Sequence, residues 1–286
     1  MKNIHSQEIS LLHKPIQLSR HLYCLTAPNP GPMTGAGTNT YLINKAERFV
    51  IVDPGPNDEA HIDAILECVG GARNIAMILV THMHPDHSPA AKPLAVLSGA
   101  PVYGWEPVDD EFQDRSCIPD VHVSHDQTIE FDGLSIRCIY TPGHVDNHVC
   151  YLLEDDAVLM TGDHIMQGST VVIIPPHGNM KQYIASLQLL TGYAIKALAP
   201  GHGELIRQPM AEINGIIQHR LLREAKVVNA LMQLTRATLE QLTTLVYNDV
   251  EPTLHPIAQL SLLAHLIKLE EESKARQQDG KWLLIS

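Results

Sequence analysis

The stretch Thr81-His82-Met83-His84-Pro85-Asp86-His87 follows an apolar run, residues 75–80, that predicts a buried strand. Pro85 disfavours a helix, so the stretch is predicted to be a loop at the end of that strand. In an extended loop, the alternate residues His82 and His84 can point at one metal ion, and Asp86 and His87 can face a second. Packing imidazoles and a carboxylate together without a metal would cost desolvation free energy. The stretch therefore predicts a metal centre.

Three more candidate ligands stand where predicted strands give way to glycine or proline. They are His144 in Thr141-Pro142-Gly143-His144, Asp163 in Thr161-Gly162-Asp163, and His202 in Pro200-Gly201-His202-Gly203. Each follows a glycine, which lets the backbone come close to a site. Seven ligands suffice for two ions if one carboxylate bridges them. Nitrogen and oxygen ligands without thiolate fit two divalent ions, with zinc expected and iron or manganese as alternatives.

Composition limits the class of protein. The chain has 286 residues and a net charge of -12, and only 5% of its residues are aromatic. An acidic chain lacks the basic footprint of a nucleic-acid-binding protein. No apolar run approaches the roughly 20 residues of a membrane helix, so we expect no membrane partner. The five cysteines form no Cys-x-x-Cys, and no apolar leader opens the chain, which favours a reducing, cytoplasmic location.

Periodicity predicts two domains, residues 1–206 and 207–286. Residues 1–25 show no clear pattern. In the rest of the first domain we expect strands at 38–43, 49–52, 75–80, 128–131, 134–140, 149–153, 157–160 and 197–199, with helices at 58–69 and 183–190. Another helix is expected to start at Ser88-Pro89, with Ser88 as its cap. The second domain predicts a long helix after Pro209, helices near 239–247 and 257–271, and a hairpin turning at Asp279-Gly280, which suggests a winged-helix-like module.

The order and spacing of these motifs resemble the metallo-β-lactamase superfamily over residues 20–206. The resemblance implies an α+β fold in which two helical layers enclose a β-sandwich, αββα, with the metals at one edge. By the same resemblance, the first metal site holds His82, His84 and His144, and the second holds Asp86, His87 and His202. Asp163 matches the bridging carboxylate, and Asp53 matches a strand-end residue that supports the site from behind.

A closer resemblance, to the β-lactamase-like endoribonucleases of animals and their bacterial relatives, covers nearly the whole chain. The matching segments are Gly37-Thr38-Asn39-Thr40-Tyr41-Leu42, Thr81 to Ser88, Gly143-His144-x-Asp146-x-His148, His265-Leu266-x-Lys268-Leu269-Glu270, and Trp282. Pro89-Ala90 departs from the glycine pair usual in that family, and His164 replaces a smaller residue. Asp163 also separates the chain from true zinc β-lactamases, which lack the bridging aspartate.

The predicted function is a hydrolase that uses a metal-bridging hydroxide, with Asp86 and Asp163 as catalytic ligands. His148 is either a catalytic proton donor or a residue that orients His144 or packs. Asn39 is expected to cap its own backbone rather than contact substrate.

Single-stranded RNA is the first expected substrate, and a small ester, thioester or lactone is the alternative. A DNA-binding protein with a vestigial metal domain is a third hypothesis, opposed by the acidic run Glu270-Glu271-Glu272 in the candidate recognition segment. The C-terminal module is expected to wall the active-site groove or to form a homodimer.

Overall fold

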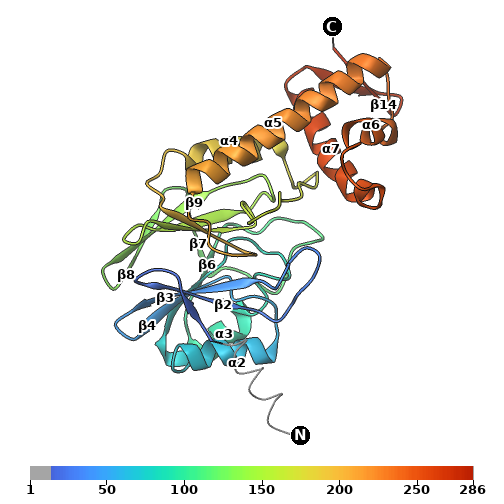
Figure 1. The fold of residues 1–286 in the computed structure, drawn as a ribbon. Coiled ribbons are helices and arrows are strands. Elements are labelled where there is room, and N and C mark those ends of the chain that lie inside the picture. The colour runs from blue at the N-terminus through green and yellow to red at the C-terminus, as the bar shows by residue number, and fades with distance from the viewer. Residues whose placement is uncertain (1–13, 286) are drawn as a thin grey trace, which may run out of the picture. The chain divides into compact units, whose positions relative to one another are not determined.

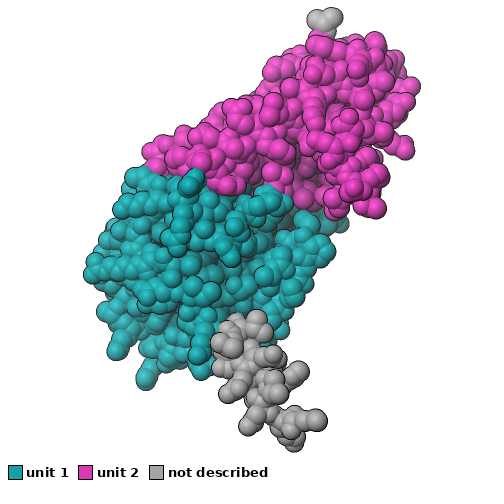
Figure 2. All heavy atoms as spheres, viewed as in Figure 1, with its two compact units in different colours: residues 1–140, 147–169, 194–209 teal, residues 141–146, 170–193, 210–286 magenta. Residues whose placement is uncertain are grey.

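The computed structural model describes residues 14–285, and these form two compact units (Figure 2). Unit 1 contains the described residues up to Tyr140, Asn147–Ser169 and Ala194–Pro209. Unit 2 contains Thr141–Asp146, Thr170–Tyr193 and the described residues from Met210 onward. The predicted domain boundary at residue 206/207 stays a prediction.

The first sheet of unit 1 has seven strands in sequence order (Figure 1). They are β1 (Ile16–Gln17), β2 (Leu22–Thr26), β3 (Asn39–Lys45), β4 (Arg48–Val52), β5 (Ile75–Leu79), β6 (Val102–Gly104) and β7 (Val121–His122). Strands β1 to β4 pair antiparallel, whereas β4 to β7 pair parallel. Parallel pairs need crossover connections, and α2 (Glu59–Cys68) and α3 (Ala91–Ser98) supply two of them.

Side chains alternate between the two faces of the first sheet, and each face contributes to a separate hydrophobic core of unit 1. Leu42 and Ile51 belong to a cluster with Ile65 of α2 and Leu94 of α3, so these helices cover one face of the sheet (Figure 1). On the other face, Tyr41, Ile43, Val50 and Val52 pack with residues of a second sheet. That sheet has the order β12-β11-β10-β9-β8, and all its pairs are antiparallel except β11–β12. Its strands are β8 (Thr128–Phe131), β9 (Leu134–Tyr140), β10 (Val149–Leu153), β11 (Val158–Gly162) and β12 (Ala197–Pro200).

Unit 2 is mainly helical and ends in a small β-ribbon. Its elements are α4 (Met180–Leu190), α5 (Pro209–Leu234), α6 (Leu239–Val246), α7 (His255–Glu271), β13 (Ala275–Gln278) and β14 (Lys281–Leu284). Asp279 and Gly280 both have positive φ, as a two-residue type I′ hairpin turn requires. Trp282 exchanges two backbone hydrogen bonds with Ala237 and lies in a core with Leu231, Leu242 and Leu266. This is the arrangement that the C-terminal sequence pattern predicts.

Most elements that show clear periodicity are confirmed, with one correction beside the metal motif. The helix expected from Ser88-Pro89 begins at Ala91, with Ala90 at its cap position. The Ser88 hydroxyl donates to Asp114 Oδ2 at 2.8 Å and caps no helix. None of the helices in the described part of the chain has the length and apolarity needed to span a membrane.

Candidate metal centre

The candidate ligands of unit 1 follow the carboxyl ends of parallel strands. The four ligands of the heptad follow β5, whose parallel neighbour β4 ends just before Asp53. Asp163 follows β11, and His202 follows its parallel neighbour β12. Because parallel neighbours end on the same side of a sheet, each pair of strands brings its loops together there. The predicted ligands of unit 1 therefore meet even though they span 120 residues of sequence.

The first group of side chains presents two imidazole nitrogens to each other. His82 Nε2 lies 3.0 Å from His84 Nδ1, and His82 Nδ1 lies 3.0 Å from the Thr81 hydroxyl. A ligand atom of Asp163 lies within 4.8 Å of both imidazoles. His82 is thus placed to bind a metal ion through Nε2 and His84 through Nδ1.

The second group consists of Asp86, His87 and His202, whose ligand atoms lie within 4.8 Å of one another. Asp86 Oδ2 is 3.4 Å from His87 Nε2 and 3.2 Å from His202 Nε2. Asp163 Oδ1 is 3.3 Å from each of the same two nitrogens. Asp163 therefore belongs to the first group and also faces the second, as a shared ligand must.

The outer nitrogens of the two imidazoles in the second group have fixed partners. His87 Nδ1 lies 3.0 Å from Asp53 Oδ2, and His202 Nδ1 lies 3.2 Å from the Gly37 carbonyl. Both partners accept hydrogen bonds, so each ring keeps a proton on Nδ1, and Nε2 is the nitrogen that would bind a metal ion. Asp53 also accepts hydrogen bonds from the amide and the hydroxyl of Thr81, each at 2.7 Å. The implied role of Asp53 as a support of the site agrees with these contacts.

Glycine at position 201 is required by close packing around the shared carboxylate. A Cβ there would lie 2.7 Å from His87 Cε1 and 2.8 Å from Asp163 Oδ1. Contacts under 3.0 Å do not occur for real Cβ atoms, so a side chain at this position would push the ligands apart. The glycine before His202 in the Gly-His-Gly motif is thus explained by the lack of space at the site.

The electrostatics of the second group fit a bound cation. Burial alone would raise the pKa of Asp86, but the imidazoles of His87 and His202 lower it to about 2. Burial alone would lower the pKa of His87, but the carboxylates of Asp86 and Asp163 raise it well above its usual value. His87 Nε2 is buried and makes no hydrogen bond within the described residues. Two carboxylates and two imidazoles, whose Nε2 protons a metal ion would replace, form a donor set suited to a divalent ion.

His144 and His148 are the two other predicted site residues. His144 belongs to unit 2, where its Nδ1 lies 3.0 Å from the Val172 carbonyl, and its part in the first metal site stays a prediction. His148 is fully buried, with its ring centroid 5.1 Å from that of His82.

Asn39 corrects an expectation, because it does not cap its own backbone. Its side-chain amide donates to the carbonyls of Pro200 and Gly203, at 3.0 and 2.8 Å, and so ties β3 to the His202 loop. The partners are more than 160 residues away in sequence, and no local pattern could have revealed them.

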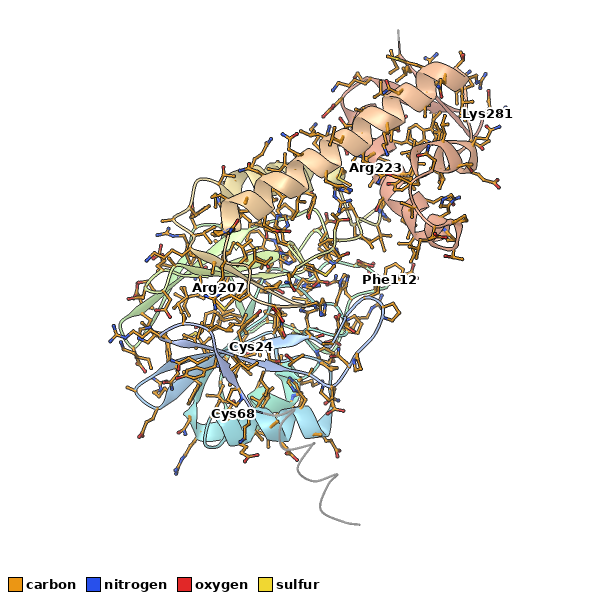
Figure 3. All side chains as sticks on the ribbon, in the orientation of Figure 1. Cys24, Cys68, Phe112, Arg207, Arg223 and Lys281 are labelled. Carbon is orange, nitrogen blue, oxygen red and sulfur yellow. The ribbon has the colours of Figure 1, made fainter. Side chains whose placement is uncertain are left out.

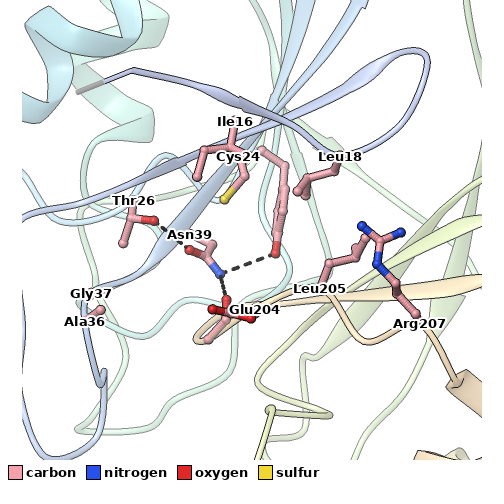
Figure 4. A pocket seen from close by; sticks show the side chains of 12 residues that line it. Ile16, Leu18, Cys24, Thr26, Ala36, Gly37, Asn39, Glu204, Leu205 and Arg207 are labelled. Atoms are coloured by element: carbon pink, nitrogen blue, oxygen red, sulfur yellow. Dashed lines mark hydrogen bonds between the residues drawn. The ribbon is translucent and has the colours of Figure 1, made fainter. Parts of the chain in front are cut away.

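A cavity of about 380 Å³ lies beside β3, on the face opposite to the candidate ligands (Figure 4). Thr38 directs its hydroxyl to Asp86 Oδ2 at 3.4 Å, whereas the next side chain, Asn39, lines the cavity. Successive side chains of a strand point to opposite faces, so the cavity is separate from the ligand groups. Its other walls are mainly apolar, and burial raises the pKa of the Cys24 thiol there to about 12.

This arrangement defines the class: two groups of histidine and carboxylate ligands at the ends of paired strands, which share one aspartate, as in metal-dependent hydrolases. The chain belongs to the metallo-beta-lactamase superfamily, which matches residues 33–202, and a beta-lactamase associated winged helix domain matches residues 238–282. It is accordingly a metal-dependent hydrolase of that superfamily. The fold class and the family resemblance predicted from the sequence are confirmed.

Three similar proteins illustrate the range of the family. A beta-lactamase-like protein 2 homolog of Caenorhabditis elegans is 30% identical over 84% of this chain and 81% of its own length. An atrochrysone carboxyl ACP thioesterase of Aspergillus novofumigatus is 25% identical over 84% of this chain and 75% of its own length. The crystal structure of a metallo-beta-lactamase family protein from Thermus thermophilus superposes with a TM-score of 0.75 at 21% identity, covering 93% of this chain and 99% of that one.

Proposed function

We propose that the protein hydrolyses phosphodiester bonds in single-stranded RNA with two bound divalent ions, which we take to be zinc. The observation that carries the proposal is the position of Asp163. Its Oδ1 lies 3.3 Å from the Nε2 atoms of His87 and His202, while the same side chain is grouped with His82 and His84. A single carboxylate placed in both groups is what a pair of neighbouring ions needs.

Each proposed ligand has one role. His82, His84 and His144 would hold the first ion, Asp86, His87 and His202 would hold the second, and Asp163 would serve as the shared ligand. When bound, such ions lower the pKa of water and neutralise negative charge on a substrate oxygen. The residues themselves fix the ligand geometry, since Asp53 and the Gly37 carbonyl orient two of the imidazoles. His148 is buried beside His82, which favours a positioning role over proton donation to a leaving group.

RNA is favoured as the substrate by the extent of the family resemblance. It covers both the metal centre and the C-terminal winged helix, and the similar beta-lactamase-like protein 2 homolog extends over most of this chain. The overall charge of -12 does not help an RNA chain to approach. Bound divalent ions would place positive charge at the one position where the scissile phosphate must lie.

Thioester hydrolysis is the second candidate, and two observations favour it. A relative of comparable identity carries the name of an acyl-carrier-protein thioesterase, and the acidic chain offers no basic footprint for nucleic acid. The same ligands could serve an acyl carbon, because a fold and its metals do not fix the bond that is cleaved.

The test is a comparison of two substrates under one set of conditions. Zinc-loaded protein is given end-labelled single-stranded RNA and, separately, an acyl-pantetheine thioester, each with and without chelator. Asp86→Ala should abolish cleavage of the true substrate, whereas Asp132→Asn should not. Asp132 is a suitable control because it pairs with Arg48 away from the ligands and has φ near +46°, which asparagine tolerates.

RNA cleavage that needs both the metal and Asp86 would support the phosphodiesterase. Thioester cleavage alone, with the same dependence, would replace it by the second candidate. Cleavage that survives Asp86→Ala would overturn the proposed centre for either substrate.

A further inference from the structure

The loop that carries His144 is packed tightly inside unit 2. A Cβ on Gly143 would lie 2.3 Å from the Tyr183 Cα atom, so the loop backbone rests directly on α4. The backbone amide of Asn179, at the start of α4, donates to the Gly143 carbonyl at 2.8 Å. The position of His144 is thus set by its neighbours within unit 2.

The orientation of the His144 ring depends on a second segment of the same unit. His144 Nδ1 donates to the Val172 carbonyl at 3.0 Å, which leaves the lone pair on Nε2. Residues 170–174 form no helix or strand, so no ladder of backbone hydrogen bonds holds that carbonyl in place. Some other contact must do so if the ring is to be fixed.

Arg220 of α5 makes that contact. Its Nη2 donates to the carbonyl of Val171, the residue just before Val172. Its guanidinium carbon lies 5.4 Å from the centroid of the Tyr183 ring, the residue on which Gly143 packs. One side chain therefore contacts both supports of the His144 loop.

A buried arginine is a costly way to fill space. Arg220 is 3% exposed, its Nε makes no hydrogen bond, and it forms no ion pair within the described residues. An apolar side chain would pack there without the desolvation penalty of a guanidinium. The long reach and the hydrogen bond to Val171 are what arginine adds at this place.

We propose that Arg220 is a positioning residue for metal binding, which acts by fixing the Val171–Val172 backbone that orients His144. The inference rests on the proposed function, in which His144 is a ligand of the first ion. It also gives α5 a role in metal binding. The pair Glu224–Lys268 joins this helix to α7 of the winged-helix module.

Arg223 offers a closely matched control on the same helix (Figure 3). Its guanidinium carbon lies 4.3 Å from the centroid of the Tyr247 ring, and its Nη1 donates to the Val246 carbonyl at 2.8 Å. It therefore makes the same two kinds of contact as Arg220, but with the end of α6. Removing either arginine costs one charge, one hydrogen bond to a backbone carbonyl and one aromatic contact, and removing Arg223 also breaks its ion pair with Asp249.

The experiment measures the stoichiometry and affinity of zinc by competition with a chromophoric chelator, with cobalt(II) absorption as a second readout. His144→Ala should lose tight binding of one of the two ions. Arg220→Leu should weaken one site by about tenfold to a hundredfold, as loss of the partners of metal ligands does. Arg223→Leu should leave both sites unchanged, and Arg220→Lys, which keeps a charged hydrogen-bond donor, should lose less affinity than Arg220→Leu.

The outcomes separate the two proposals. If His144→Ala retains both ions, His144 is not a ligand and the proposed site is wrong. If His144→Ala loses an ion but Arg220→Leu does not, or if Arg220→Leu and Arg223→Leu weaken binding equally, only the inference about Arg220 fails. Should Arg220→Leu not fold, Arg220→Gln against Arg223→Gln makes the same comparison, because glutamine keeps a hydrogen-bond donor.

Discussion

Two buried clusters of histidine and carboxylate in this molecule differ in what balances their negative charge. In the metal centre, Asp86 contacts His87 and His202 and pairs with no lysine or arginine within the described residues. In unit 2, Glu224 lies 2.8 Å from the ammonium of Lys268 and 3.6 Å from His265 Nδ1. The second cluster contains its own cation, and the first does not.

The pKa values of one histidine in each cluster, His87 and His265, are shifted in opposite directions. His87 and His265 are both fully buried. Burial lowers the pKa of His265, and the carboxylate of Glu224 beside it does not reverse that effect. Next to Asp86 and Asp163, the pKa of His87 is instead raised. A histidine–carboxylate cluster without a resident ammonium attracts a cation, whereas one with an ammonium is a structural ion pair.

Removing the shared carboxylate should have the largest effect. Asp163→Ala is expected to lower kcat/KM for the true substrate by at least about a thousandfold, because the two proposed ions would lose their common ligand and several kcal/mol of charge stabilisation with it. His84→Ala should behave alike. Circular dichroism and thermal unfolding should show a native fold in both, and turnover near the wild-type rate in either variant would contradict the proposed centre.

Removing the resident cation of the second cluster should instead affect stability alone. Lys268→Met leaves Glu224 buried without its ammonium, which should cost about 3 kcal/mol in the free energy of unfolding measured with urea. The double variant Glu224→Leu/Lys268→Met should recover most of that loss, since no unpaired charge remains.

Lys226→Met is the matched control for that variant. Lys226 lies on α5, as Glu224 does, and its replacement breaks an exposed pair with Asp249, which should change the free energy by no more than about 0.5 kcal/mol. A loss of turnover in Lys268→Met at full zinc occupancy would show that the second cluster is more than structural.

The candidate ligands could be predicted from the sequence, whereas the residues that support them could not. The heptad and the three Gly-His or Gly-Asp motifs are local patterns at strand ends, so the candidate ligands could be predicted before any contact was known. Strands β1, β6 and β7 have two or three residues each and are too short to show a period. Arg220 and Asn39 act through backbone carbonyls 49 and 161 residues away, and no spacing rule connects them. His265 belongs to a segment that carries the family resemblance, but nothing in the sequence pairs it with Glu224.

The smallest expected effect is a dependence of stability on pH in the metal-free protein. The raised pKa of His87 means that the folded state binds more protons than the unfolded chain. Its contribution is complete below about pH 6.5 and is lost as the pH rises through the folded pKa. The lowered pKa of His265 has the opposite effect, so its contribution is complete above about pH 6.5 and is lost as the pH falls.

The free energy of unfolding of chelator-treated protein should therefore decline on both sides of about pH 6.5. His87→Gln should flatten the alkaline side, with part of the slope kept by His202, whose pKa is also raised. His265→Gln should flatten the acid side. Zinc should abolish the alkaline decline, because the metal takes the place of the protons. If His87→Gln instead flattened the acid side and His265→Gln the alkaline side, the pKa shifts of the two histidines would have the opposite signs to those expected from their surroundings.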